Sequence, residues 1–322
     1  MEMRYRDFGS WIRERFPFRV QKLSVDAGFS CPNRDGRIGT GGCIYCDNRT
    51  FNPAYCDNRL SVTDQLERGK AFFARKYPQM KYLAYFQAYT NTYAPTEQLT
   101  ALYKEALAVD DVVGLVIGTR PDCMSTELLD YLSELNNGKG SDYGYQQRNV
   151  GTFVLVEYGI ESANDTTLRL INRGHDFACV RRTVEETHRR GLLTGGHVIL
   201  GLPGDDREES LRQAHLISGL PLDILKIHQM QVIEGTPLAR LYREQHFHVY
   251  SLEEYIELVT EYVRRLRPSL VLERFVSQSP AHLLVAPKWG IKNHEFTALL
   301  HRYMEQVDAR QGEAELRNNC EL

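Results

Sequence analysis

The sequence has no apolar run long enough to cross a membrane, and residues 1–15 lack the apolar stretch of a secretory signal. The longest apolar runs, 112–118 and 283–287, have the length of single strands. A basic excess is missing too, since the formal net charge is -3. These absences argue against membrane-spanning helices and against a globally basic nucleic-acid-binding protein, and they predict a cytoplasmic location.

Whole-chain disorder is also excluded, because hydrophobic residues make up 42% of the 322 positions. A chain of this length can bury about three quarters of its unfolded surface, so it needs no disulfides for stability. The seven cysteines are an odd number. In a reducing cytoplasm, clustered thiols indicate metal or redox chemistry more often than disulfide bonds.

Apolar β-branched runs alternate with amphipathic segments over most of the chain. We expect six strands, over 22–26, 82–87, 112–118, 153–159, 196–202 and 224–233. The intervening helices begin near Thr63, Thr96, Thr126, Asn164 and Asp205. Strands joined by single helices pair in parallel, so the fold class is α/β, with an open, partial (β/α)6 barrel or a closed one, and the functional residues are expected where the strands end.

Residues 1–245 are predicted to form this barrel, and residues 246–308 an α/β extension that caps or lines it. The extension should hold a helix over 251–267, a short strand over 270–275 and a helix over 293–307. The tail, 309–322, is expected to be frayed. The glycine-rich stretch 136–149 is predicted to be a mobile loop on the face opposite the functional residues, without a catalytic role.

Three cysteines follow the first predicted strand, within GFSCPNRDGRIGTGGCIYCDN. Cys43 and Cys46 form a C-x-x-C pair that can hold a metal centre from one turn, and the glycines before Cys43 let the chain fold back from Cys31. Three thiolates on a four-iron cluster leave one iron open to a substrate or cofactor. We therefore predict that Cys31, Cys43 and Cys46 hold a catalytic iron–sulfur cluster in the loop 27–56.

A structural zinc site with Cys56 as the fourth ligand is the alternative. Cys56 follows Cys46 by ten residues, whereas structural zinc sites favour a second close pair, so the cluster is the better interpretation. Cys123 and Cys179 lie beside apolar periodic positions and are expected in the core. Cys320 is expected to be an exposed thiol of the tail.

The cysteine loop resembles that of the radical S-adenosylmethionine (SAM) superfamily, which also places an aromatic residue, here Tyr45, before the last cysteine. The first spacing is wider than is usual there and resembles the widened loops of the Elongator catalytic subunit and of YhcC-type proteins. The resemblance to the YhcC type continues through DAGFSCPNRDG, YLAYFQAYTNTY, GTRPDC, INRGHDFAC, ILGLPG and LKIH. We therefore identify the chain as a YhcC-type radical SAM protein without an acetyltransferase domain.

This resemblance implies a [4Fe–4S] cluster that cleaves SAM reductively to methionine and a 5′-deoxyadenosyl radical, with an electron donor such as flavodoxin or ferredoxin. Kinship with the Elongator subunit suggests transfer RNA (tRNA) as partner and its wobble uridine as substrate. Local basic residues give modest support: Arg4, Arg6, Arg13, Arg15, Arg19, Lys22, Arg264, Arg265 and Arg267. Two alternatives stay open, a radical enzyme acting on a protein or metabolite and a non-catalytic, zinc-stabilised interaction module.

Polar residues at the later strand ends are candidate SAM contacts by the same resemblance. Gln87, Tyr89, Thr90 and Asn91 would meet the amino group, Glu157 and Ser162 the ribose, Arg173 the carboxylate, and Gly201 and Pro203 the adenine. Structural alternatives are a hydrogen-bonded turn for 87–91, an internal ion pair for Glu157 and a salt bridge for Arg173. Arg120 could face the site or pair with Asp122.

Lys226 and His228 are two apart on the last predicted barrel strand, so their side chains share a face. If this face lines the barrel interior, both lie near the substrate as catalytic residues, and Gln229 points outward. The later segment with Arg274 and residues 286–293 is predicted to be a lid or plug of the barrel, or a cap over its open edge.

Overall fold

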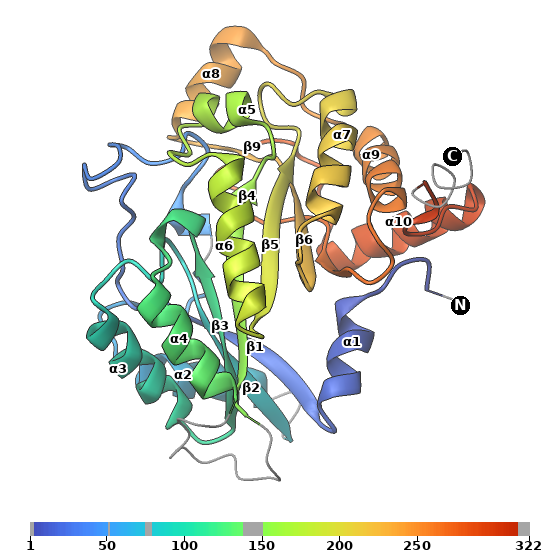
Figure 1. The fold of residues 1–322 in the computed structure, drawn as a ribbon. Coiled ribbons are helices and arrows are strands. Elements are labelled where there is room, and N and C mark those ends of the chain that lie inside the picture. Colours follow the sequence, from blue (N-terminus) through green and yellow to red (C-terminus); the bar gives the residue numbers. More distant parts are fainter. Residues whose placement is uncertain (1–2, 51, 75–78, 138–150, 315–322) are drawn as a thin grey trace.

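The computed structural model describes residues 3–50, 52–74, 79–137 and 151–314. Seven parallel strands form one curled sheet in the order β1-β2-β3-β4-β5-β6-β8 (Figure 1). The strands are β1 (Arg19–Val25), β2 (Met80–Phe86), β3 (Val112–Thr119), β4 (Phe153–Glu161), β5 (Leu193–Leu200), β6 (Ile224–Gln229) and β8 (Val271–Arg274). Because β1 and β8 are edge strands, the sheet is a half-barrel, which confirms the predicted partial barrel.

Helices cover the convex side of this sheet, as parallel strands with helical crossovers require. The helices of the barrel are α2 (Val62–Ala74), α3 (Thr96–Leu107), α4 (Thr126–Asn136), α5 (Asp165–Leu170), α6 (Phe177–Arg189) and α7 (Arg207–Ser218). The remaining ones are α1 (Phe8–Arg15), α8 (Pro237–Gln245), α9 (Leu252–Arg264) and α10 (Asn293–Gln306). Among the helices of the described ranges, none is long and apolar enough to span a membrane.

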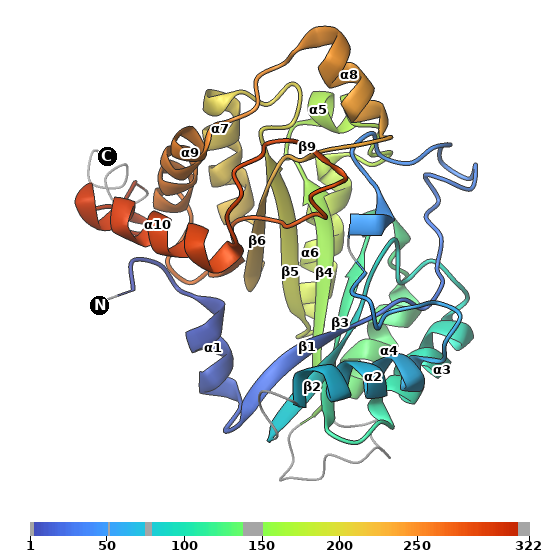
Figure 2. The ribbon, with the colours of Figure 1, turned by 180° about the vertical axis from the view of Figure 1, so that it is seen from behind.

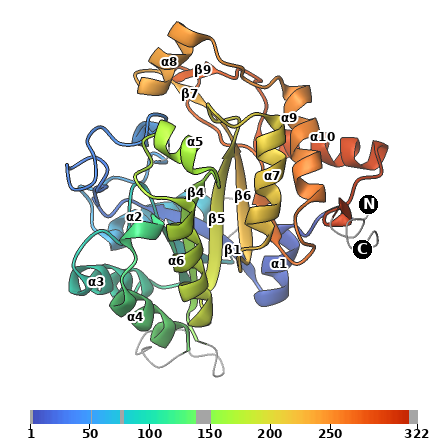
Figure 3. The same cartoon turned by 45° about the horizontal axis from the view of Figure 1, so that its top comes forward.

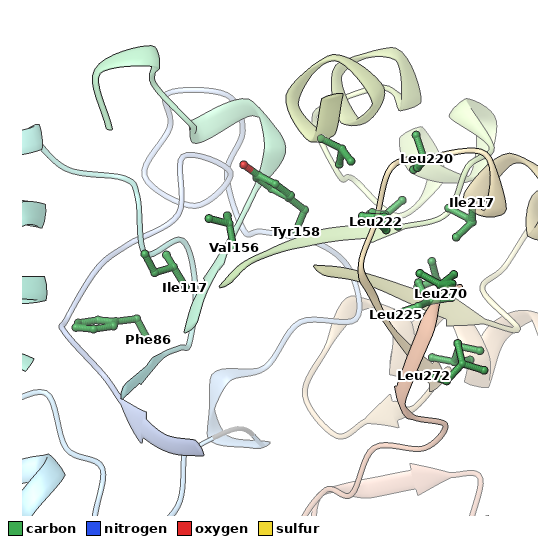
Figure 4. Close-up of a cluster of buried hydrophobic side chains, with 14 of the residues drawn as sticks. Phe86, Ile117, Val156, Tyr158, Ile217, Leu220, Leu222, Leu225, Leu270 and Leu272 are labelled. Carbon is green, nitrogen blue, oxygen red and sulfur yellow. The ribbon is translucent and has the colours of Figure 1, made fainter. Parts of the chain in front are cut away.

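The main core lies between the sheet and these helices (Figure 4). Phe86, Ile117, Val156 and Tyr158, on three neighbouring strands, are fully buried in it, and Leu225 extends the cluster on β6. Strands that are buried on both faces read as nearly continuous apolar runs, which explains why β3 has the sequence VVGLVIGT.

The concave side of the sheet is sealed at the end where the strands begin. Trp11 of α1 is buried there against Leu83, Leu155 and Ile224, whose side chains point into the half-barrel. Asp7 caps α1 by accepting a hydrogen bond of 2.9 Å from the Ser10 amide, which holds the helix in this place. The apolar plug closes one end of the barrel and leaves the other end for the polar residues.

The strand count differs from the prediction, because the C-terminal extension adds β8 to the sheet beside β6. The predicted strand 224–233 is also interrupted, since β6 ends at Gln229 and β7 (Val232–Ile233) pairs antiparallel with β9 (Leu284–Ala286). Figure 2 shows the C-terminal segment crossing the open side of the half-barrel. The predicted loop from residue 138 onward, and Cys320 in the tail, lie outside the described residues.

We expect Trp11→Ala to lower the free energy of unfolding by about 3–5 kcal/mol, because it leaves a large cavity in the plug. Urea unfolding followed by circular dichroism measures the change. Phe72→Ala removes an aromatic side chain that is 61% exposed and serves as the control, with an expected change within about 0.5 kcal/mol. Equal effects of the two substitutions would show that Trp11 does not seal the barrel.

Candidate active site

The loop that carries the cysteines folds over the ends of the strands and is fixed by backbone hydrogen bonds. A β-bridge between Asp35 and Thr40 turns the long excursion after Cys31 into a small hairpin. The Cys46 amide then donates to the Cys43 carbonyl at 3.0 Å, so both thiols project from one turn. The Ile44 amide donates to the Ile171 carbonyl at 3.1 Å, which ties the loop to the segment after α5.

Cys31, Cys43 and Cys46 line one cavity of about 170 Å³. Among the described residues, no three histidine, cysteine, aspartate or glutamate side chains converge on a point that could hold a single metal ion. Thiols spread around a cavity suit a multi-iron cluster, in which each cysteine binds a different iron. Cys56, the fourth ligand of the zinc alternative, instead lies 3.3 Å from Gln65 Oε1 in a separate buried cluster.

Two guanidinium groups flank the thiols. Arg173 Nη1 lies 3.6 Å from Cys43 Sγ, and Arg34 Nη2 donates to the Cys46 carbonyl at 2.9 Å. Burial and the neighbouring Cys43 raise the pKa of Cys46 to about 11, although both arginines oppose this shift. A set of thiolates bound to iron carries negative charge that these cations offset, so the residues fit a cluster.

Three buried polar atoms around the same cavity have no partner in the described chain: Thr90 Oγ1, Asn91 Oδ1 and Arg120 Nη1. A buried polar atom without a hydrogen bond costs about 1–3 kcal/mol, so such a group is expected at a place where a ligand satisfies it. The rest of the Arg120 guanidinium binds Asp122 through two hydrogen bonds of 2.8 Å. The sequence left open whether Arg120 faces the site or pairs with Asp122. In the structure it pairs with Asp122 and also lines the cavity.

The other predicted SAM contacts fall into two groups. Gln87, Tyr89, Glu157 and Arg173 line the cysteine cavity, whereas Ser162, Gly201 and Pro203 do not. The Ser162 hydroxyl donates to Asp205 at 2.8 Å, in a buried network behind β4. A side chain at Gly201, whose φ is +88°, would come within 3.1 Å of the Tyr250 ring, so this glycine is needed for packing.

Glu157 is the centre of a buried charge network in the middle of the half-barrel. Its carboxylate lies 2.9 Å from Lys22 Nζ and 2.7 Å from Lys226 Nζ, and Glu273 lies 2.7 Å from Lys22. Burial alone would raise the pKa of Glu157, but Lys22, Lys226 and His197 outweigh it and hold this pKa well below its ordinary value. The internal ion pair expected as the alternative for Glu157 is therefore present, with two lysines rather than one.

A chain of close polar contacts leads from Glu157 through His197 to His228. The carboxylate lies 3.0 Å from His197 Nε2, and His197 Nδ1 lies 3.2 Å from His228 Nε2. Burial lowers the pKa of His197, and burial together with the charge on Arg274 lowers the pKa of His228, so both rings are neutral at pH 7. Lys226, predicted to be catalytic with His228, lies below it against Glu157, and it lines neither cavity at the strand ends.

A second, larger cavity of about 520 Å³ lies next to the first at the strand ends. It is lined by His228 and by the C-terminal residues Arg274, Ser277 and Asn293. Tyr45, Gln87, Glu161 and His197 line both cavities and therefore mark where they adjoin. Figure 3 turns this end of the molecule forward and shows that α5, α8, β7 and β9 lie there.

The expected outward orientation of Gln229 is wrong. Gln229 lines the larger cavity, and its amide exchanges two hydrogen bonds with the Ser277 backbone, of 2.9 and 2.7 Å. Gln231 accepts a hydrogen bond from Ser279 at 2.7 Å, so two alternating glutamines pin residues 277–279 onto the barrel. This wall was not among the predicted features, although the alternating polar residues of QMQ and SQS are the sequence signal for it.

Most of the basic residues named from the sequence lie away from both cavities. Arg13, Arg15 and Arg19 lie in α1 and at the start of β1, where the strands begin, and Lys22 belongs to the buried network. Arg264 and Arg265 pair with Glu261 on the same helix. This group therefore gives no support to nucleic-acid binding at the strand ends.

Lys226→Gln is expected to lower the free energy of unfolding by about 3 kcal/mol, because it leaves part of the buried charge of Glu157 without its partner. Lys70→Gln, which breaks the more exposed pair with Glu67, is the control and should cost less than about 1 kcal/mol. Urea unfolding of both variants at pH 7 provides the comparison. A Lys226 variant as stable as the wild type would show that the network does not brace the barrel.

Comparison with known proteins places this geometry in a family. YhcC of Escherichia coli is 35% identical over 299 residues, which cover 93% of this chain and 92% of that protein. A tRNA uridine(34) acetyltransferase of Methanocaldococcus infernus is 28% identical over 202 residues, 62% of this chain but 34% of that protein. The structure of Elp3 from the same archaeon, lacking residues 1–46, has the same fold, with a TM-score of 0.66 and 19% identity over 91% of this chain and 64% of that one.

Two family models match the chain directly. The model of the radical SAM superfamily matches residues 34–214, and that of the radical SAM C-terminal domain matches residues 222–306. The matched ranges include Cys43, Cys46 and the segment that lines the larger cavity. The chain therefore belongs to the radical SAM superfamily, and it is a radical SAM enzyme with a [4Fe–4S] cluster and SAM as its cofactors.

Proposed function

We propose that this enzyme modifies the wobble uridine of tRNA, at a side chain on carbon 5 of the base. The observation that carries the proposal is the 202-residue similarity to proteins named tRNA uridine(34) acetyltransferase. Since only 34% of that relative is covered, the shared part concerns radical chemistry rather than acetyl transfer. In this proposal residues 1–245 hold the cofactors, and the extension 246–308 completes the substrate cavity.

The two adjoining cavities support a division of labour. When bound, the cluster supplies the electron that cleaves SAM, and the resulting 5′-deoxyadenosyl radical takes a hydrogen atom from the substrate. Cys31, Cys43 and Cys46 would hold the cluster, and the unpartnered atoms of Thr90, Asn91 and Arg120 would bind SAM. The larger cavity, at about 520 Å³, lies within the size range of small-molecule sites and could accept a base turned out of its RNA loop.

Residues at the cavity wall would orient the substrate and exclude water. Tyr45 and His197 contact both cavities, so a substrate group in the larger one lies next to SAM in the smaller one. A primary alkyl radical abstracts hydrogen from accessible C–H and S–H groups, so the main contribution of the protein would be to place the substrate beside it and to exclude competing donors. The segment 277–279, pinned by Gln229 and Gln231, forms the outer part of this wall.

Near the cysteine loop, arginine and tyrosine side chains are paired. Arg34 lies 5.3 Å from the centre of the Tyr89 ring, and Arg37, which is exposed, lies 5.6 Å from that of Tyr93. Aromatic rings and guanidinium planes are the groups on which unpaired RNA bases stack. We infer that these pairs contact the anticodon loop. We further propose that the enzyme works in the cytoplasm and that an external donor such as flavodoxin or ferredoxin reduces the cluster.

Cys43→Ala should abolish the formation of 5′-deoxyadenosine from SAM, because one cluster ligand is lost. The test uses protein reconstituted with iron and sulfide without oxygen, reduced with dithionite, and measures 5′-deoxyadenosine by chromatography. Cys56→Ala is the matched control and should retain cleavage and iron content, since Cys56 lies outside the cysteine cavity. Undiminished cleavage by the Cys43 variant would contradict the assigned ligand set.

Deletion of the gene should remove one modified wobble uridine from tRNA and leave its precursor in place. Nucleoside mass spectrometry of digested tRNA from the deletion strain measures both species. The wild-type gene should restore the nucleoside, and a gene carrying Cys43→Ala should not. An unchanged nucleoside profile would overturn the proposal and favour a protein or metabolite as substrate.

A further inference from the structure

Arg274, the last residue of β8, is an arginine of the larger cavity without a counter-ion. Its Nε is buried and has no hydrogen-bond partner, and the guanidinium forms no ion pair with any residue that the structure describes. A guanidinium carries five N–H donors and a permanent charge; Arg274 is partly buried, and its Nε, which solvent does not reach, is left without an acceptor, which is unfavourable. Such a group is expected where a ligand supplies the missing acceptor.

Among the residues that the structure describes, four other cations of the half-barrel interior have carboxylate partners, whereas Arg34 lies against the Cys46 carbonyl and the Tyr89 ring. Lys22 and Lys226 bind Glu157 and Glu273, as described above. At the cysteine cavity, Arg173 lies 3.4 Å from Glu161, and Arg120 binds Asp122 at 2.8 Å. Against these pairs, Arg274 is a surplus positive charge on the wall of the substrate cavity.

Neighbouring groups do not compensate this charge. The carboxylate of the adjacent Glu273 is already paired with Lys22 and Lys226. His228 and His197 are neutral and offer no negative charge, and the charge on Arg274 itself contributes to the lowered pKa of His228. The cavity wall is therefore electropositive at this point, which favours an anion.

A second unpartnered atom lies in the same cavity. Asn293 Oδ1, at the start of α10, is buried without a hydrogen-bond donor in the described chain. The amides of Gln229 and Gln231 are already engaged with residues 277–279, so they are not the groups that await a ligand. The cavity wall thus offers a cation, Arg274, and a hydrogen-bond acceptor, Asn293 Oδ1. A ligand that carries an anionic oxygen for the cation and an N–H or O–H donor for the acceptor would match both groups.

We propose that the larger cavity binds an oxyanion of the substrate, a carboxylate or a phosphate, on the guanidinium of Arg274, while Asn293 Oδ1 accepts a hydrogen bond from the same substrate. The inference deepens the proposed function, because it rests on the larger cavity being the substrate site. For tRNA the oxyanion belongs either to an acidic side chain on the base or to the phosphate beside it. A neutral substrate would leave both groups unsatisfied.

Binding of small anions to the holoenzyme tests this directly. Isothermal titration calorimetry at low ionic strength, without oxygen and with SAM at saturation, measures the Kd values of succinate, of its diamide succinamide and of inorganic phosphate. Succinate or phosphate should bind at least about tenfold more tightly than succinamide, and Arg274→Gln should raise the Kd of the anion by about 10- to 100-fold. Arg240→Gln, at an exposed position of α8, is the control and should leave this Kd unchanged.

The outcomes also identify the source of the oxyanion. Tighter binding of succinate indicates a carboxylate, and tighter binding of phosphate indicates the RNA backbone. Equal Kd values for anions and succinamide, or an Arg274 variant that binds anions like the wild type, would overturn the inference. Because no RNA is used, this failure is distinct from an unchanged tRNA nucleoside profile, which would overturn the proposed function alone.

The stability of the same variant is a second measurement that separates a binding role of Arg274 from a structural role. Because Arg274 lacks a counter-ion, Arg274→Gln should leave the urea midpoint of the holoenzyme unchanged or raise it, as is common when a binding residue is removed. Lys226→Gln, which breaks the buried ion pair with Glu157, should lower it. A lower midpoint for Arg274→Gln would show that the arginine supports the fold, and would overturn its assignment to a ligand.

Discussion

The architecture of the half-barrel depends on the ion pairs that the buried carboxylate of Glu157 forms. This carboxylate joins Lys22 on β1, Lys226 on β6 and His197 on β5, and Lys22 adds Glu273 on β8. A half-barrel lacks the hydrogen bonds that would close its edge strands, and ion pairs across its interior link both edges to the centre. These charges also divide the interior into an apolar floor around Trp11 and a polar space at the strand ends.

The polar space has two parts with different chemistry. Three thiols and two flanking arginines line the smaller cavity, where Thr90, Asn91 and Arg120 carry buried polar atoms without a partner in the described chain. The larger cavity is completed by β8 and the segment after it, held by the glutamines at the end of β6. The C-terminal extension therefore lines the larger cavity, and the proposed function places the substrate there, next to the cysteine cavity.

Features that local spacing and hydrophobic period determine could be predicted from the sequence. The C-x-x-C pair, the strands and the polar residues after them follow from spacing and period, and Thr90, Asn91 and Arg120 do line the cysteine cavity. Side-chain partners across the barrel could not be predicted in this way. For Glu157 the sequence predicts either the ribose of SAM or an internal ion pair, but the choice of Lys22, Lys226 and His197 depends on how strands that are far apart in the sequence meet. Ser162 and Gly201 were placed at the cofactor by resemblance, whereas tertiary packing turns them toward Asp205 and Tyr250.

We assign Cys31, Cys43 and Cys46 to a four-iron cluster whose remaining iron binds SAM. Mössbauer spectroscopy of the oxygen-free holoenzyme, with and without SAM, distinguishes the four irons. One iron of the cluster should differ from the others, and its isomer shift should increase when SAM is added, because this iron has no cysteine ligand. Four equivalent irons, or a spectrum that SAM does not change, would contradict this assignment.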